Sequence, residues 1–316
     1  MIICRTRAEL KLALSNLREH NKSIGFVPTM GFLHEGHASL LRQAKEENDV
    51  IVLSIFVNPL QFGPNEDLDR YPRDEQRDLA LAEENGTTLV FLPSVQEMYP
   101  QKPLTSVIVN QVTDRLCGAT RPGHFDGVGT VVSKLFHLVN PDRAYFGMKD
   151  AQQVAVIEQM VSDLNFDVKV VACPIVREPD GLALSSRNVY LTPEQREQAV
   201  VLSRTLRLAA EWKEERGMTA ERLEAKVKEA LNAAGEAVID YVELLRYPSL
   251  QPPEAAAELH TFAEPLILAL AVKFGATRLI DNHILQATEV HSNVQNDDEI
   301  QASPGNRNGS ELELCR

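Results

Sequence analysis

Two histidines lie three residues apart in the segment 28–37, whose sequence is PTMGFLHEGH. An apolar run precedes this segment and an amphipathic run follows it, an order that predicts a strand, a tight turn and a helix. His34 and His37 would then share one face of the first helical turn, where unpaired N–H groups and the helix dipole favour an anion. The pattern indicates a polyphosphate site. The alternative is a capped surface helix with two exposed histidines.

Two other segments carry charges and hydroxyl groups that suit a phosphate. Residues 147–150 follow an apolar run, and Lys149 can reach phosphate oxygens there as a compact point charge. Residues 180–188 hold two serines beside Arg187, whose guanidinium can bind a phosphate through two parallel hydrogen bonds. Each segment alone also fits a solvated polar turn. Together the three segments favour a site for a nucleotide.

Two glutamines suggest a second kind of site. Gln61 and Gln153 each follow an expected strand end, and an amide offers donors and an acceptor without charge. Such a pair suits a substrate with hydroxyl and carbonyl groups, whereas simple solvent exposure is the alternative for each. Residues 121–127 form a polar, turn-rich segment before a helix. They predict either a mobile lid or a helix start with Asp126 as the N-cap.

The common glycine-rich nucleotide loops are absent from the sequence. There is no G-x-x-x-x-G-K-[ST] motif, and Gly127 and Gly129 lack the third glycine of the dinucleotide fingerprint. We therefore expect neither a P-loop NTPase nor a dinucleotide-binding enzyme. A nucleotide would have to be bound by other groups.

The composition narrows the class of protein. The 316 residues are 44% hydrophobic and 24% charged, with a formal net charge of -13, which argues against a nucleic-acid partner. The four cysteines show no paired spacing, so we expect reduced thiols rather than a zinc site or a disulfide framework. Neither a signal-peptide core nor an apolar run near the ~20 residues needed to span a bilayer is present. We expect a cytoplasmic protein without membrane contact.

The elements that would position these residues alternate along the first half of the chain. Apolar runs separated by amphipathic runs predict a parallel sheet in an α/β domain, with ligands at the carboxyl ends of its strands. The expected strands are 24–27, 50–57, 88–92, 144–146 and 168–173. The expected helices are 7–20, 37–47, 74–85, 127–139 and 151–164.

The pattern changes after residue 176. Two amphipathic helices, 193–216 and 220–234, and three strands, 238–245, 266–273 and 279–284, predict a smaller α+β domain. From residue 286 onward the composition is too polar to bury a core. We therefore expect three parts, which are a nucleotide-binding domain at 1–176, a C-terminal domain at 177–285 and a disordered tail at 286–316.

Five segments of the chain resemble the pantothenate synthetase (pantoate–β-alanine ligase) family. This family belongs to the nucleotidyltransferase-like superfamily, which has a Rossmann-like parallel sheet and is related to class I aminoacyl-tRNA synthetases. The matching segments are 28–37, 56–73, 121–128, 145–153 and 177–188, and the resemblance runs from about residue 1 to 285.

The resemblance implies an activity and its cofactors. ATP and (R)-pantoate would give pantoyl adenylate and pyrophosphate, and β-alanine would then displace AMP to give pantothenate. The resemblance further implies a homodimer, small-molecule substrates only, and Mg²⁺ carried mainly by the nucleotide phosphates without a metal site on the protein. Two alternatives are a nucleotidyltransferase that stops at a nucleotidylated product and a nucleotide-binding module without enzymatic activity.

The resemblance also implies roles for individual residues. Gln61 would contact both pantoate and β-alanine, and Gln153 would bind pantoate. His34, His37 and Lys149 would be the catalytic residues. The family assigns proton donation to His37, but we expect that residue to stabilise phosphate charge. The ATP site would comprise Met30, Gly31, Phe32, Leu33, His34, Glu35, Gly36, His37, Gly147, Met148, Lys149, Asp150, Val176, Leu184, Ser185, Ser186 and Arg187.

Overall fold

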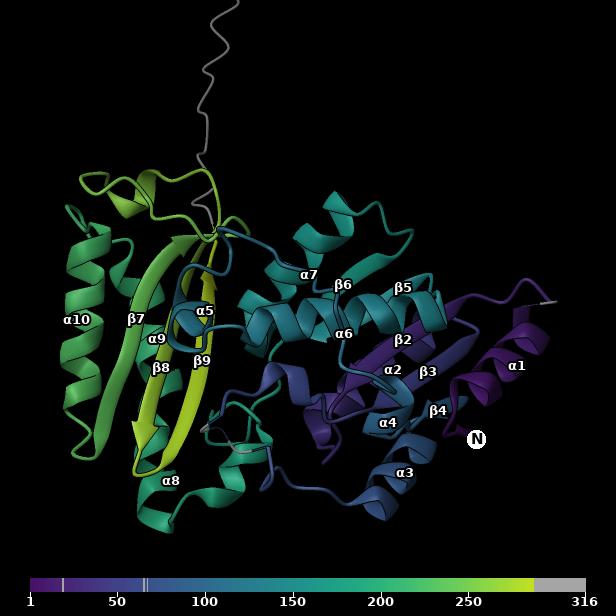
Figure 1. The fold of residues 1–316 in the computed structure, drawn as a ribbon. Coiled ribbons are helices and arrows are strands. Elements are labelled where there is room, and N and C mark those ends of the chain that lie inside the picture. Colours follow the sequence, from purple (N-terminus) through teal and green to yellow (C-terminus); the bar gives the residue numbers. More distant parts are fainter. Residues whose placement is uncertain (19, 65, 67, 287–316) are drawn as a thin grey trace, which may run out of the picture.

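The computed structural model describes residues 1–18, 20–64, 66 and 68–286, which contain two β-sheets (Figure 1). The larger sheet is parallel throughout and has the strand order β1-β4-β3-β2-β5-β6. Its strands are β1 (Ile2–Cys4), β2 (Ile24–Thr29), β3 (Val50–Ile55), β4 (Leu89–Phe91), β5 (Arg143–Gly147) and β6 (Lys169–Cys173). The predicted parallel α/β sheet is confirmed. The three-residue strand β1 was not predicted, because it is too short to show a periodic pattern.

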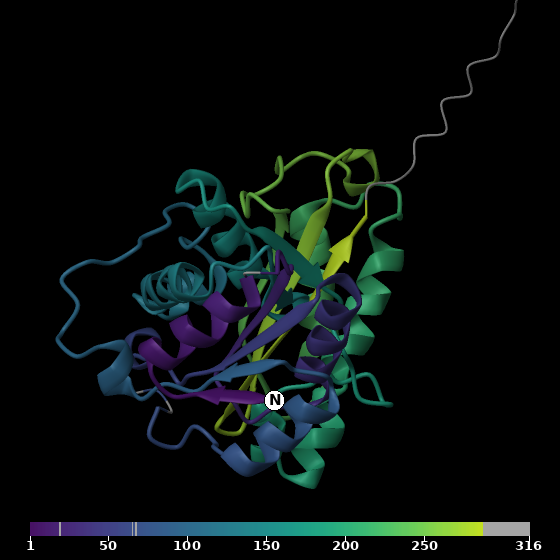
Figure 2. The same ribbon diagram turned by 90° about the vertical axis from the view of Figure 1, so that its right-hand side faces the viewer.

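Helices cover both faces of this sheet (Figure 2). One face packs against α1 (Arg7–Arg18), α6 (His124–Val139) and α7 (Ala151–Asp163). The other face packs against α2 (Glu35–Glu47) and α3 (Glu75–Glu84). Strands buried on both faces are continuous apolar runs, which is why the sequence revealed most of them.

Several short elements were not predicted. They are α4 (Val95–Met98), α5 (Leu116–Thr120) and the 3₁₀ turns η1 (Pro59–Gln61), η2 (Met148–Asp150), η3 (Ser186–Tyr190) and η4 (Leu259–Thr261). Elements of three to five residues are too short for a helical repeat to appear in the sequence. The turns η1, η2 and η3 nevertheless contain candidate site residues.

The smaller sheet is antiparallel and stands beside the larger one (Figure 1). It consists of β7 (Ala237–Arg246), β8 (Leu266–Phe274) and β9 (Thr277–Leu285). Its outer face packs against α9 (Val201–Trp212) and α10 (Ala220–Asn232), whereas Ile267 and Ala269 on its inner face join the core of the parallel sheet. The predicted α+β architecture is confirmed. The domain boundary at residue 176 stays a prediction, because the two sheets share a core.

One helix prediction was wrong. The expected helix 193–216 is two helices, α8 (Pro193–Ala199) and α9, separated at Val200. α8 buries only Ala199, whereas α9 buries an apolar stripe that includes Leu202 and Leu206. The break lets α9 lie against the sheet while α8 stays at the surface. The apolar repeat in the sequence predicted helical structure over this range, but it did not predict the break at Val200.

Truncation of the C-terminal tail tests whether the residues after β9 contribute to stability and activity. Residues 287–316 of the predicted tail lie outside the described residues. Gln286 is described, and its carbonyl accepts a hydrogen bond of 2.5 Å from Nζ of Lys213, a side chain that is only 4% exposed. We expect a chain ending at Gln286 to keep the melting temperature and activity of the full chain. A chain ending at Leu285 should melt lower, because a buried ammonium loses an acceptor. Thermal melts and activity assays of the two truncations test this, and a large loss in the longer one would contradict it.

No helix within the described ranges is long and apolar enough to cross a membrane.

Candidate active site

Three neighbouring strands end at the same edge of the parallel sheet. β2 pairs in parallel with β3 on one side and with β5 on the other. The loops that follow these strands therefore lie next to one another. They contain residues 30–34, 56–61 and 148–150, which belong to segments that the sequence singled out.

A cavity of about 950 Å³ opens beside this edge, between the two sheets. Tyr241 and Arg278 of the antiparallel sheet line one side of it. Of the predicted site residues, the cavity is lined by Lys149, Asp150, Gln153, Ser185 and Arg187. The structure thus brings both cationic segments and one of the two glutamines to a single cavity. His34, His37 and Gln61 lie at the adjoining strand ends, outside this lining.

His34 and His37 form a closed pair at the start of α2. Nδ1 of His34, the N-cap, accepts a hydrogen bond of 3.1 Å from the amide of Gly36. Nδ1 of His37 accepts one of 3.2 Å from the amide of His34, and the ring centroids are 4.1 Å apart. Because each Nδ1 is an acceptor, each neutral ring carries its proton on Nε2. Both rings can therefore donate an Nε2–H hydrogen bond to a ligand.

Both imidazoles are uncharged at neutral pH. Burial, together with the charges of Lys149 and Arg77, lowers the pKa of His34 to about 4. Burial and the neighbouring His34 lower the pKa of His37 to about 3. A neutral ring stabilises developing phosphate charge as a hydrogen-bond donor. The positive charge at this end of the site comes from Lys149 and Arg187.

These low pKa values predict a loss of stability in acid. The unfolded chain takes up protons on His34 and His37 near pH 6.5, but the folded chain does so only near pH 4 and pH 3. Protonation of these histidines in the unfolded chain should therefore lower the free energy of unfolding as the pH falls from about 6.5 towards 4. Above about pH 7 their effect on that free energy should be constant. Urea unfolding at about pH 7.5, 6 and 5 measures this. His34→Asn should lose less stability over that range, and an equal loss in both proteins would contradict the prediction.

Asp78 of α3 holds the turn that precedes α2. Its carboxylate is 2% exposed and accepts hydrogen bonds from the amides of Phe32 at 2.8 Å and Leu33 at 2.6 Å. Gly31 and Phe32 have φ values of 85° and 50°, in the left-handed region that a phenylalanine rarely adopts. The carboxylate therefore stabilises a turn that Phe32 disfavours, whereas Gly31 adopts it readily. No local pattern in the sequence indicates this role, because Asp78 lies far from the motif.

The lysine segment carries an ion pair. Lys149 and Asp150, both in η2, lie 3.1 Å apart. Partial burial of the half-exposed Asp150 carboxyl would raise its pKa, but Lys149 and Arg187 outweigh that effect and hold the pKa below its ordinary value. The side chain of Met148 packs with the core, and its sulfur lies 3.7 Å from the hydroxyl of Tyr247. Met148 can therefore serve a nucleotide only through its backbone.

The serine–arginine segment lies against the start of α2. The carbonyl of Val176 accepts a 3.0 Å hydrogen bond from the amide of Leu184, which closes the loop between them. A Cβ on Gly36 would be 3.9 Å from the side chain of Leu184, so this loop and the histidine pair are neighbours. Ser185 caps η3 by accepting a 3.2 Å hydrogen bond from the amide of Arg187. Ser186, the first residue of η3, is buried.

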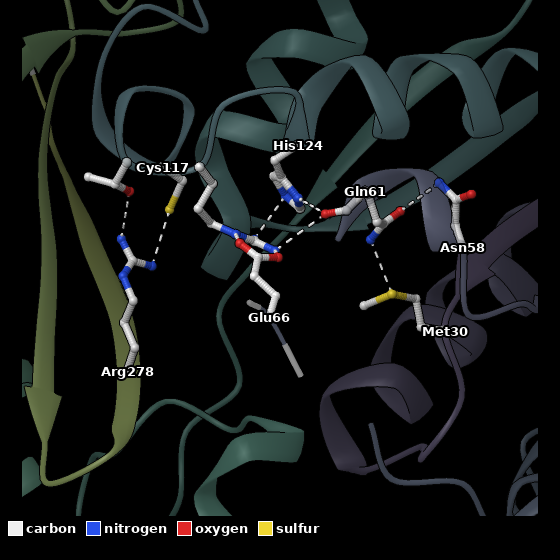
Figure 3. A network of polar contacts seen from close by, with 9 residues as sticks. Met30, Asn58, Gln61, Glu66, Cys117, His124 and Arg278 are labelled. Atoms are coloured by element: carbon white, nitrogen blue, oxygen red, sulfur yellow. Dashed lines mark hydrogen bonds and ion pairs between the residues drawn. The ribbon is translucent and has the colours of Figure 1, made fainter. Parts of the chain in front are cut away.

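Gln61 lies in a buried hydrogen-bond network (Figure 3). Its Oε1 accepts a 3.2 Å hydrogen bond from Asn58, and its Nε2 lies 3.1 Å from the sulfur of Met30. Asn58 is 1% exposed and also donates to the carbonyl of Gly127 at 3.0 Å. A Cβ on Gly127 would come within 2.6 Å of the Gln61 backbone, so only glycine lets α6 approach this closely. Asn58 was not predicted as a site residue, because its only sign in the sequence is its place after a strand.

A second network holds the backbone of Gln61. Nδ1 of His124 lies 2.8 Å from the Gln61 carbonyl (Figure 3). Nε2 of the same ring lies 3.1 Å from the guanidinium of Arg121. Arg121 in turn binds both carboxylate oxygens of Glu66, at 2.7 and 2.6 Å. Burial and the charge of Arg121 lower the pKa of His124 to about 4, so this ring is also neutral. The network joins the turn-rich segment to the glutamine.

The predicted cap of this segment was wrong. α6 begins at His124, after Gly123 with a φ of 80°, so Asp126 lies inside the first turn and is not the N-cap. A left-handed glycine provides the change of direction that the prediction assigned to an aspartate cap.

Gln153 lies in the first turn of α7 and lines the cavity.

The geometry can be compared with known proteins. The family model described as pantoate-beta-alanine ligase matches residues 2–284. The chain belongs to the pantoate–β-alanine ligase family. It is 52% identical over 286 residues to the pantothenate synthetase of Caldicellulosiruptor saccharolyticus, covering 90% of this chain and 100% of that relative. It is 55% identical over 282 residues to that of Bacillus cereus, covering 89% and 98%.

Solved structures of the pantoate–β-alanine ligase family have the same fold. Pantothenate synthetase from Thermus thermophilus superimposes with a TM-score of 0.82 at 47% identity, covering 90% of this chain and 100% of that one. The ligase from Francisella tularensis, complexed with beta-gamma ATP and beta-alanine, gives 0.73 at 36% identity, covering 90% and 98%. The family resemblance and the fold class expected from the sequence are both confirmed.

Proposed function

We propose that this chain joins pantoate to β-alanine in two steps, through a pantoyl adenylate formed at the cavity between the two sheets. As a member of its family the chain is a ligase that forms pantothenate from those two substrates. The observation that supports the adenylate route is the gathering of two cations, two neutral N–H donors and two amides at one sheet edge.

The first step activates the acid. A carboxylate does not acylate an amine, because oxide is a poor leaving group. A carboxylate oxygen of pantoate would attack the α-phosphorus of ATP, and the bond from that phosphorus to pyrophosphate would break. Negative charge grows on the departing phosphates, where Lys149 and Arg187 supply positive charge and His34 and His37 supply Nε2–H donors. No proton has to move in this step, which favours a charge-stabilising role for His37.

The second step forms the amide. The amine of β-alanine would attack the acyl carbon, AMP would leave, and the nitrogen would lose a proton. Gln61 and Gln153 would hold pantoate against the α-phosphorus, and Gln61 would also contact the incoming amine substrate. Enclosure between the two sheets would protect the mixed anhydride from water.

The nucleotide would bring its own Mg²⁺. No group of three or more His, Cys, Asp or Glu side chains that could hold a metal is found among the described residues. Mg²⁺ in nucleotide sites keeps several waters and uses one or two carboxylates plus substrate phosphates. Asp150, which lines the cavity beside Lys149, would be one carboxylate able to approach such an ion. The ion would neutralise phosphate charge.

Product analysis tests this function. The purified chain is incubated with ATP, Mg²⁺ and pantoate, with and without β-alanine, and AMP, pyrophosphate and pantothenate are followed. We expect free AMP to accumulate with pantothenate only when β-alanine is present, and pantoate-dependent ATP–pyrophosphate exchange without it. A nucleotidylated end product would instead support a nucleotidyltransferase, and no turnover would support a nucleotide-binding module.

Gln61→Ala should impair the use of pantoate more than the use of ATP. Loss of one hydrogen bond worth about 1.4 kcal/mol raises the KM for pantoate roughly tenfold. Steady-state kinetics with each substrate varied measure the difference. Gln43→Ala, on the exposed side of α2, is the matched control and should change neither KM. Equal effects on both KM values in Gln61→Ala would count against this assignment.

Two expectations stay predictions, namely the homodimer that the family resemblance implies and the cytoplasmic location that the composition indicates. Light scattering of the purified chain tests the first, and fractionation of the source cells tests the second.

A further inference from the structure

β9 carries two consecutive buried polar residues, Asp281 and Asn282. They are 2% and 4% exposed. Burial of a carboxylate and an amide costs free energy unless both are fully paired, so their partners show what they hold in place. Successive strand residues point to opposite faces of a sheet, so the two side chains reach different neighbours. Those neighbours are the two cationic segments of the proposed ATP site.

Asn282 holds the backbone on both sides of Lys149. Its Nδ2 donates to the carbonyl of Met148 at 2.8 Å and to the carbonyl of Lys149 at 3.0 Å. These carbonyls belong to the two peptide units that flank the Lys149 Cα. One side chain therefore restrains both backbone dihedrals of the lysine. η2 has no side-chain N-cap, so this restraint comes from the other sheet.

Asp281 holds the serine–arginine segment. Its two carboxylate oxygens accept hydrogen bonds of 2.6 and 2.9 Å from the guanidinium of Arg177. Arg177 also donates to the carbonyl of Gly181 at 3.2 Å and forms a β-bridge with Ala183. The loop that leads to Arg187 is thus fixed to the same strand. A bidentate pair fixes direction as well as distance.

We propose that Asp281 and Asn282 are positioning residues for the adenylation step, and that β9 sets the separation of Lys149 and Arg187. This proposal rests on the proposed function. Neither β9 residue needs to touch the nucleotide. Each acts through one cation, and a displacement of that cation by about 1 Å is enough to cost on the order of 10²-fold in rate.

A double-mutant cycle tests the link between Asn282 and Lys149. Asn282→Leu keeps the branched shape of the side chain and removes both N–H donors. We expect it to slow pantoate-dependent ATP–pyrophosphate exchange by about 10- to 100-fold. In a Lys149→Ala background the same change should slow exchange less than about threefold further, because the positioned group is already gone. Additive effects in the cycle would overturn the proposal, since a general structural role acts in both backgrounds.

Lys213→Met is the matched control. Like Asn282, Lys213 is a buried donor to a backbone carbonyl, but its acceptor Gln286 follows β9 and does not line the cavity. The substitution should lower the melting temperature and leave the exchange rate within about twofold of the unchanged chain. A loss of exchange in Lys213→Met as large as that in Asn282→Leu would show that any loss of stability slows the enzyme, which would overturn the positioning role.

The exchange rates of Asn282→Leu and Lys149→Ala distinguish a failure of the positioning role of β9 from a failure of the proposed function. Normal exchange in Asn282→Leu beside slow exchange in Lys149→Ala overturns the inference alone. Normal exchange in Lys149→Ala overturns the phosphate-site assignment itself. If Asn282→Leu does not fold, the cycle of Arg177→Lys with Arg187→Ala decides, because Arg177 is partly exposed and lysine cannot form the bidentate pair. Non-additive effects there support the proposal, and additive effects overturn it.

Discussion

Lys149→Ala is expected to slow pantoate-dependent ATP–pyrophosphate exchange by about 10²–10³-fold and to leave the melting temperature almost unchanged. The ammonium lies at the carboxyl end of β5, where it would meet the charge that grows on the phosphates in the proposed adenylation step. Its contribution to folding is small, because Asp150, its ion-pair partner, has a side chain that is 48% exposed. Water can replace the lost partner of this half-exposed carboxylate.

The lysine prediction has two matched controls. Lys169→Ala removes an exposed ammonium from β6, on the same sheet, and should leave exchange unchanged. Lys149→Arg keeps the charge but replaces a compact ammonium with a planar guanidinium, and should recover only part of the rate. An exchange rate in Lys149→Ala within about threefold of the unchanged chain would remove this lysine from the site.

Two substitutions of His34 should separate its structural role from its chemical role. His34→Ala removes both the N-cap of α2 and the Nε2–H donor, so it should lower stability by about 0.5–2 kcal/mol and exchange by about 10²–10³-fold. His34→Asn places an amide oxygen where Nδ1 accepts from Gly36, so it should keep most of the stability but still lose the rate.

Urea unfolding and exchange kinetics of both His34 variants provide the comparison. Thr219→Ala is the control, because Thr219 caps α10 in the same way and does not belong to the proposed site. It should lose stability and keep its exchange rate. If His34→Asn retained full exchange, the histidine would matter only as a cap, and the phosphate contact would have to come from other donors.

Prediction of the secondary structure from the sequence succeeded where the physical signal was local. The strand–turn–helix order around residues 28–37 and the strand that precedes Lys149 are both encoded by contiguous residues. Strands buried on both faces stood out for the same reason, since their apolar runs are uninterrupted. The protonation states of the histidines could not be predicted, because burial in the folded chain sets them.

Residues that act across long distances in the chain were not predicted. Asp78 binds amides 45 and 46 residues away, and Asn282 binds carbonyls 133 and 134 residues away. Neither belongs to a motif, and each would look like an ordinary polar residue of a helix or strand. The break at Val200 and the cap at Gly123 were missed because tertiary packing decides them.

The carboxylate of Asp78 has a consequence for inhibitors of this chain. The amides of Phe32 and Leu33, in the turn that leads into α2, already donate hydrogen bonds to an internal carboxylate. A sulfonate or phosphonate aimed at that turn would meet a negative charge and gain nothing. A neutral acceptor such as a sulfone or an acyl sulfamide oxygen, directed at the two Nε2–H groups, would find donors that carry no counter-ion to displace.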